Sequence, residues 1–202
     1  MPIEKGREYR AVQDFSLAPR EGEEKTYRVR GTAVVFDTPT CLYEIDGVKY
    51  FEIIDRHAFD ECDMTDVIFN YNHGGKVVAR LRNQTLRLSI GDNGLDMEAD
   101  LSGTTAGREL WDEIDGGYVD KMSFSFSVRA SEYDAATHTR RITKVRRLYD
   151  VAAVDFPAYD ETSISARSFF EGERSREVRT LEQARRRRLL EARIRTYSHT
   201  KN

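Results

Sequence analysis

The chain has 202 residues, a net charge of −3, a hydrophobic fraction of 39% and a charged fraction of 33%. This length and composition predict one soluble domain with a compact core and an appended arm. No apolar run reaches the roughly 18 residues that a membrane-spanning helix needs, and residues 1–10 lack the apolar stretch of a secretory signal, so we expect neither feature.

Most of the chain between residues 26 and 170 has the pattern of short β-strands, because apolar or β-branched residues alternate with polar ones. Asp46-Gly47 lies between two such runs and predicts a hairpin turn. The expected strands cover residues 27–36, 42–45, 48–54, 67–71, 77–81, 85–90, 95–101, 122–128, 141–145 and 148–156.

Two helices are expected within the folded domain. His57–Glu61 is predicted to form a short helix, and residues 104–115 form the best helical pattern, with Leu110, Trp111 and Ile114 on one face. Residues 131–140 are predicted to be a polar loop, and Gly74-Gly75 is expected to break the strand that precedes it. Many short strands with one main helix predict a β-rich α+β fold, as a barrel or a sandwich with attached helices.

The C-terminal segment differs in charge from the rest. Residues 171–202 carry a charge of +5, which leaves −8 on residues 1–170. Residues 173–195 contain no Gly or Pro and are rich in Arg, Glu, Leu and Ala, which predicts a helix. The sequence therefore predicts an irregular lead-in over residues 1–25, a folded domain over 26–170 and a basic helical tail over 171–202.

The few cysteines and histidines limit the possible chemistry. Cys41 and Cys62 lie in different segments, which favours free thiols in a reducing cytoplasm over a disulfide framework. No metal-ligand spacing is present, so we expect neither a metal nor a cofactor. The run Arg185–Arg188 does not favour nucleic-acid binding, because the domain is acidic and glutamates interrupt the basic tail.

The strand at residues 122–128 is the most informative segment, because small hydroxyl side chains alternate with large apolar ones. Ser123, Ser125 and Ser127 share one face, and the opposite face carries Met122, Phe124, Phe126 and Val128. A solvent-facing strand surface usually carries larger polar side chains, so the serines indicate a face that something else approaches closely. Alternatively, they line the outside of a half-buried strand.

Ser123 is the leading candidate nucleophile, and His73, at the end of an apolar run, is the leading general base. Asp150 interrupts the apolar strand Leu148–Val154, where a buried carboxylate needs a cationic or N–H partner. Holding the second nitrogen of His73 would provide one. The alternatives are a histidine bonded to a backbone carbonyl, an aspartate paired with Arg146 or Arg147, and Asp155 as the third member.

Several segments together resemble the prohead proteases of tailed phages, the capsid-maturation serine proteases considered relatives of the herpesvirus assemblins. The resemblance spans about residues 25–167 and depends on the order and spacing of its motifs. These motifs are Gly31–Phe36, Phe51–Ile54, His57–Asp60, Asn72-His73, Gly94-Leu95, Gly117–Phe126 and Tyr149–Ala158.

The resemblance places the family's Asn-His histidine on His73, its Met-Ser-Phe serine on Ser123 and its glutamate on Asp150. Three positions depart from the family pattern: Gly74 replaces an aspartate, Ser125 replaces a glycine, and Asp150 is one methylene shorter than glutamate. The resemblance also implies a herpesvirus-protease-like β-barrel surrounded by helices.

The function that the resemblance implies is that of a serine endopeptidase inside the phage procapsid, in the cytoplasm of the bacterial host. Its expected substrates are scaffold segments, the scaffold-like part of the major capsid protein, and the protease itself. A homodimer is plausible by analogy with the assemblins, and no membrane partner is expected. The alternative is a non-enzymatic capsid assembly or scaffolding protein with the same fold.

Overall fold

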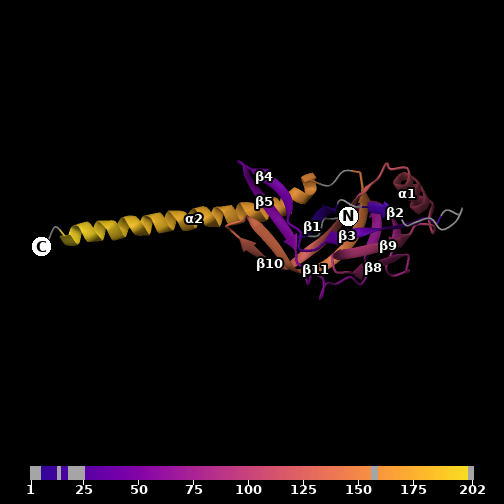
Figure 1. The fold of residues 1–202 in the computed structure, drawn as a ribbon, viewed down its shortest axis with the longest axis horizontal. Helices are drawn as coiled ribbons and strands as arrows, with labels where there is room; N and C mark the ends of the chain where they lie inside the picture. Colours follow the sequence, from indigo (N-terminus) through magenta and orange to yellow (C-terminus); the bar gives the residue numbers. More distant parts are fainter. Residues whose placement is uncertain (1–5, 13–14, 18–25, 156–158, 200–202) are drawn as a thin grey trace. The chain divides into compact units, whose positions relative to one another are not determined.

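The computed structural model describes residues 6–12, 15–17, 26–155 and 159–199. The chain forms two compact units, Met1–Ser165 and Ala166–Asn202. The first unit contains two sheets and the helix α1 (Figure 1).

The larger sheet has seven strands and is mixed. Its main path is β1 (Arg7–Val12), β10 (Lys121–Asp134), β11 (Thr139–Val154), β5 (Val48–Ile54) and β4 (Thr40–Ile45). The first part of β11 pairs with β5 and its last part pairs with β6 (Ile68–Tyr71), both in parallel. The hairpin partner of β6 is β7 (Gly74–Arg80).

The smaller sheet has four antiparallel strands. Its order is β2 (Phe15–Leu17), β3 (Arg28–Val35), β9 (Gly94–Asp100) and β8 (Leu86–Ile90). Helix α1 (Thr105–Asp115) follows β9, and the Thr104 hydroxyl caps it by accepting a hydrogen bond from the Gly107 amide. The three residues predicted to share its apolar face are all buried.

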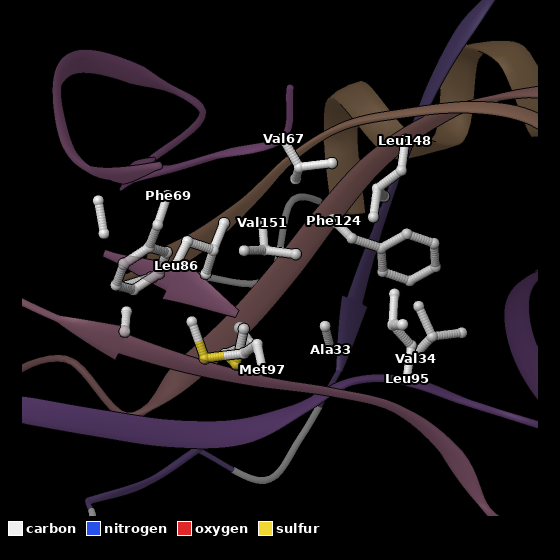
Figure 2. Packing of buried hydrophobic residues seen from close by; sticks show 14 of the residues in the cluster. Ala33, Val34, Val67, Phe69, Leu86, Leu95, Met97, Phe124, Leu148 and Val151 are labelled. Atoms are coloured by element: carbon white, nitrogen blue, oxygen red, sulfur yellow. The ribbon is translucent and has the colours of Figure 1, made fainter. Parts of the chain in front are cut away.

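The hydrophobic core lies between the two sheets (Figure 2). Phe69, Phe124, Leu148 and Val151 come from the seven-stranded sheet, and Val34, Leu86, Leu95 and Met97 come from the four-stranded sheet. Complete burial of each such side chain stabilises the fold by about 1.5–3 kcal/mol. The phenylalanine face of β10 is therefore anchored in the core, and its serine face must point the other way.

The predicted β-rich α+β class is confirmed, but the described strands form two sheets and no closed barrel. The cause is the length of β11, which has 16 residues. Its partners on one edge change from β5 near Thr139–Ile142 to β6 near Asp150–Ala153. The large sheet consequently divides into two branches.

Four local expectations differ from the structure. Residues 7–12 and 15–17 of the supposedly irregular lead-in are strands, and β10 and β11 continue through much of the predicted polar loop. The expected strands 141–145 and 148–156 are parts of one strand as far as Val154, because ladder pairing continues through their polar residues. His57–Glu61 forms successive turns instead of the expected helix, with backbone hydrogen bonds between residues three positions apart.

Some expectations cannot be compared with the structure. The predicted strand end at Phe156 and Pro157 lies outside the described residues, as do parts of the lead-in. The domain boundaries at residues 25/26 and 170/171 stay predictions.

Helix α2 (Tyr159–His199) includes all of the predicted tail helix. Within the second unit, Val178, Leu181, Leu189 and Leu190 are exposed large apolar residues. Ion pairs one turn apart, Arg167–Glu171 and Arg187–Glu191, support its solvated surface. Among the described residues, no helix is long and apolar enough to cross a membrane.

Candidate active site

Ser123 lies on β10, where two small residues are its neighbours across the sheet. Its register partners are Ala11 on β1 and Ala152 on β11. These methyl groups leave space beside the serine hydroxyl for a larger side chain. Ser123 and Ser125 are fully buried, so the serine face of β10 is covered and does not line an exposed surface.

His73 lies in the two-residue turn that joins β6 to β7. Tyr71 pairs with Gly74, and the intervening Asn72 and His73 have φ angles of 50° and 54°. Two positive φ angles are typical of a type I′ hairpin turn, in which asparagine is favoured at the first position. A non-glycine residue in this conformation costs about 1–3 kcal/mol and is often found at a functional site.

The strand before His73 ends here, as expected, but the turn at Asn72 and His73 ends it and not the glycine pair. β6 stops at Tyr71, and Gly74 is the first residue of β7, where it closes the hairpin opposite Tyr71. The resemblance implies an aspartate at position 74, and in this chain a residue without a side chain closes the hairpin.

The imidazole of His73 bridges Ser123 and Asp150. Its Nε2 atom lies 2.6 Å from the Ser123 hydroxyl, and its Nδ1 atom lies 2.6 Å from Oδ1 of Asp150. With Nδ1 protonated, the ring donates to the carboxylate and accepts from the serine hydroxyl. This is the arrangement that a serine nucleophile, a general base and an orienting acid require.

Asp150 is 1% exposed and uses both of its carboxylate oxygens. Oδ1 faces His73, and Oδ2 accepts a hydrogen bond from the guanidinium of Arg7. Neighbouring Arg147, one of the alternative partners considered for Asp150, pairs instead with Asp63 at 3.6 Å. The buried carboxylate therefore has an N–H partner on each side, and its shorter side chain still reaches His73.

Asp155, the other candidate for the third position, binds a different part of the hairpin. It accepts hydrogen bonds from the Tyr71 hydroxyl and from Nδ2 of Asn72, the latter at 3.0 Å. The hydrogen bond from the tyrosine raises the pKa of Tyr71 to about 12. Asp155 thus fastens the turn that carries His73, whereas Asp150 contacts the imidazole itself.

Two residues near the site come from β1, which lies in the predicted irregular lead-in. Nη2 of Arg7 donates to Oγ of Ser125 at 2.7 Å as well as to Asp150. The Tyr9 ring meets the His73 ring edge to face, with centroids 4.7 Å apart. The only hint in the sequence is a weak two-residue alternation between residues 7 and 12.

The partners of the two serines also differ. Oγ of Ser125 accepts from an arginine, and Oγ of Ser123 contacts the histidine ring. A guanidinium cannot accept a proton, but a neutral imidazole can. The geometry therefore favours Ser123 over Ser125 as the group that could be deprotonated for attack.

Other possible reactive groups lie in different surroundings. His57 is largely exposed and contacts Asp60, and His138 contacts the Tyr133 hydroxyl. Cys41 and Cys62 are free, and burial raises the pKa of the Cys62 thiol to about 11. No cluster of three or more metal-ligating side chains occurs among the described residues.

Comparisons with known proteins identify the family. No curated protein sequence matches the chain. Among solved structures, the chain is similar to the capsid assembly protease gp21 of bacteriophage T4, with 12% sequence identity and a TM-score of 0.42. The similarity covers 75% of this chain and 99% of that one. A family model described as caudovirus prohead serine protease matches residues 13–175. Because this match covers most of the sequence, the chain belongs to the caudovirus prohead serine protease family and is a serine protease.

Proposed function

We propose that this protein is the endopeptidase of phage head maturation, with Ser123 as nucleophile, His73 as general base and Asp150 as the acid that orients the imidazole. The observation that carries the proposal is the position of His73, whose two nitrogens each lie 2.6 Å from one of the other two residues. Family membership supports the same reaction class.

The first half of the reaction transfers the acyl group to the enzyme. His73 Nε2 takes the proton of the Ser123 hydroxyl while Oγ attacks the carbonyl carbon of the scissile peptide bond. Asp150 stabilises the imidazolium through its Nδ1–H. As the tetrahedral intermediate collapses, the C–N bond breaks, the leaving amine takes the proton from Nε2, and an acyl-serine remains.

The second half regenerates the enzyme by hydrolysis. His73 Nε2 removes a proton from water, the water oxygen attacks the acyl carbonyl, and the proton returns to Oγ of Ser123 as the ester bond breaks. Backbone amides are expected to stabilise the oxyanion in both halves. Since Ser123 is fully buried, a substrate carbonyl reaches Oγ only after the groups that cover it move.

The proposed substrates are scaffold segments, the scaffold-like part of the major capsid protein, and this chain itself. The proposed place of action is the inside of the procapsid in the bacterial cytoplasm, where confinement raises the local concentrations of protease and substrate. We further propose that the basic C-terminal helix docks the protease in the shell or is cleaved from it. A dimer and a fold relationship to the herpesvirus assemblins belong to the same proposal.

The test is to co-express the chain with the major capsid protein of the same phage and to follow cleavage by mass spectrometry. We expect Ser123→Ala to abolish cleavage, because no other described hydroxyl contacts His73. Ser127→Ala is the matched control, since it removes a hydroxyl from the same face of β10 and leaves the three proposed catalytic residues intact.

Full processing by Ser123→Ala would remove Ser123 from the nucleophile role. If neither the wild type nor any variant cleaves itself or capsid protein, and if no variant reacts with a serine-directed reagent, a non-enzymatic assembly role becomes the better account. Truncation after Arg167 tests the tail separately: peptidase activity should persist while incorporation into the shell falls. Normal incorporation would contradict docking through the tail.

A further inference from the structure

Strand β1 lies before the family-matched span, which begins at residue 13, yet it borders the proposed catalytic residues. It pairs antiparallel with β10 along its whole length, from Arg7 opposite Ser127 to Val12 opposite Met122. Because side chains alternate along a strand, Arg7, Tyr9 and Ala11 share the face of β10 that carries Ser123.

Arg7 makes the most direct contacts. Its guanidinium binds Asp150 at the oxygen that His73 does not use, and also binds Ser125. The same guanidinium lies over the rings of Tyr9 and Tyr149, at 5.3 and 4.8 Å from the ring centroids. Arg7 is therefore held between two aromatic rings while it directs its N–H groups at the buried acid.

Tyr9 contacts the base instead of the acid. Its ring packs against the imidazole of His73 at an interplanar angle of 69°. This contact restricts rotation of the imidazole, whose two nitrogens must face different partners at the same time. Together, Arg7 and Tyr9 place one β1 side chain against each of two proposed catalytic residues.

The opposite face of β1 fixes the strand in position. Glu8 and Arg10 are buried there with Glu52 of β5 and Arg140 of β11. Arg10 contacts Glu52 at 2.5 and 2.8 Å, and Arg140 contacts Glu8 at 3.0 Å. The register of Arg7 and Tyr9 against the site therefore depends on more than the ladder with β10.

We propose that β1 contributes to the catalytic site and that Arg7 is a positioning residue that holds the Asp150 carboxylate oriented toward His73. This inference rests on the proposed function of Ser123, His73 and Asp150. A carboxylate with almost no solvent contact needs donors for both oxygens. Without Arg7, Oδ2 loses its donor, and the carboxylate can turn away from Nδ1 of His73, which removes the contact that orients the imidazole.

The test measures the reactivity of Ser123 in the full chain with a fluorophosphonate probe over a range of probe concentrations. We expect Arg7→Gln to lower the saturating labelling rate about 10–100-fold. A loss of this size is usual when the hydrogen-bonding partner of a functional side chain, such as a metal ligand, is removed. The half-saturating probe concentration should stay within about threefold, because Arg7 acts on the acid and not on the probe. Arg7→Lys keeps the charge and should restore most of the rate.

One further variant and two controls complete the test. Tyr9→Leu should reduce the saturating rate about 3–10-fold, because loss of the aromatic contact frees the imidazole to rotate. Ser123→Ala should give no labelling, and Arg87→Gln, on an exposed position of β8, should label as the wild type does. Thermal unfolding curves ensure that each variant is assayed while folded.

The possible failures are distinguishable. If the wild type labels at Ser123 and Arg7→Gln labels equally fast, the role of Arg7 is refuted while the proposed nucleophile stands. If the wild type does not label at Ser123, the proposed function itself fails. If Arg7→Gln does not fold, Tyr9→Leu decides the question, because a wild-type labelling rate in that variant would refute a role for β1.

Discussion

Each face of β1 places an arginine against a buried carboxylate, but the two clusters differ in what they can do. On one face, Arg10 and Arg140 balance Glu8 and Glu52, all four less than 10% exposed. On the other face, Arg7 and Asp150 are joined through His73 to a serine hydroxyl. Only the second cluster contains a group that can accept and return a proton near neutral pH.

Burial and ion pairing by themselves therefore do not identify an active site. In the Arg10 cluster, burial opposes ionisation of Glu8, but the charges of Arg10 and Arg140 outweigh it and lower the pKa of the Glu8 carboxyl. That cluster is closed, because each carboxylate already faces an arginine. The distinguishing feature of the other face is the contact between an imidazole and a hydroxyl.

The sharpest test of this difference compares Asp150→Asn with Asp155→Asn, two identical changes at the same end of the large sheet. We expect Asp150→Asn to lower kcat by about 10⁴-fold, because an amide cannot keep the imidazole in the required tautomer. Asp155→Asn should cost no more than about tenfold, since Asp155 fastens the turn and does not contact the ring. Equal losses, measured by peptide cleavage kinetics, would contradict the assignment of Asp150.

The second test targets the closed cluster with Glu52→Gln. Loss of this charge leaves Arg10 buried without its main partner, and we expect the free energy of unfolding to fall by about 3–5 kcal/mol. For the molecules that remain folded, kcat should stay within about threefold, because the pairs of Glu8 with Arg140 and Arg10, together with the ladder to β10, still hold β1. Denaturant titration and cleavage kinetics on the same preparation check both parts. A large loss of kcat at unchanged stability would overturn the distinction between the two faces.

Acid should weaken the fold through the carboxyls that arginines or hydrogen bonds stabilise. The pKa of Glu8 lies below its ordinary 4.5, and the pKa values of Asp37 and Asp66 lie below their ordinary 3.8. The unfolded chain therefore binds protons first as pH falls, so stability is complete above about pH 4.5 and decreases below it. Denaturant titrations between pH 6 and pH 3 measure the effect, and a flat profile would contradict it.

The smallest expected effect concerns the turn that carries His73. The hydrogen bond to Asp155 raises the pKa of Tyr71 from 10.0 to about 12, so Tyr71 adds stability below pH 10 that is lost as the pH rises toward 12. Asp155→Asn removes the charged acceptor and should return the pKa of Tyr71 toward 10. Tyrosine-selective NMR titration, with a Tyr71→Phe variant for assignment, follows the change. An unaltered pKa would mean that Asp155 does not hold the turn.

The sequence by itself determined which residues could carry the chemistry. The alternation around Ser123 defines two unlike faces of a strand, His73 follows an apolar run, and Asp150 interrupts a second apolar run. These patterns are local, and a local pattern indicates the direction in which a side chain points. Where the predicted strands had clear apolar alternation, as in the hairpin at Asp46-Gly47, the structure has them too. His57–Glu61 was expected to be a short helix, but its backbone hydrogen bonds join residues three positions apart and form successive turns.

Only the tertiary structure decided which of those residues meet. His73 is 50 positions from Ser123 and 77 positions from Asp150 along the chain, yet it contacts both. The alternation of side chains along a strand does not specify which strands are its neighbours in the sheet. The same reason explains why Arg7 and Tyr9 were overlooked: a short, charged segment shows little periodicity, and its order comes from pairing with β10 and from the Arg10 cluster. Long-range pairing placed these side chains together, and no property of residues 7–12 alone could have done so.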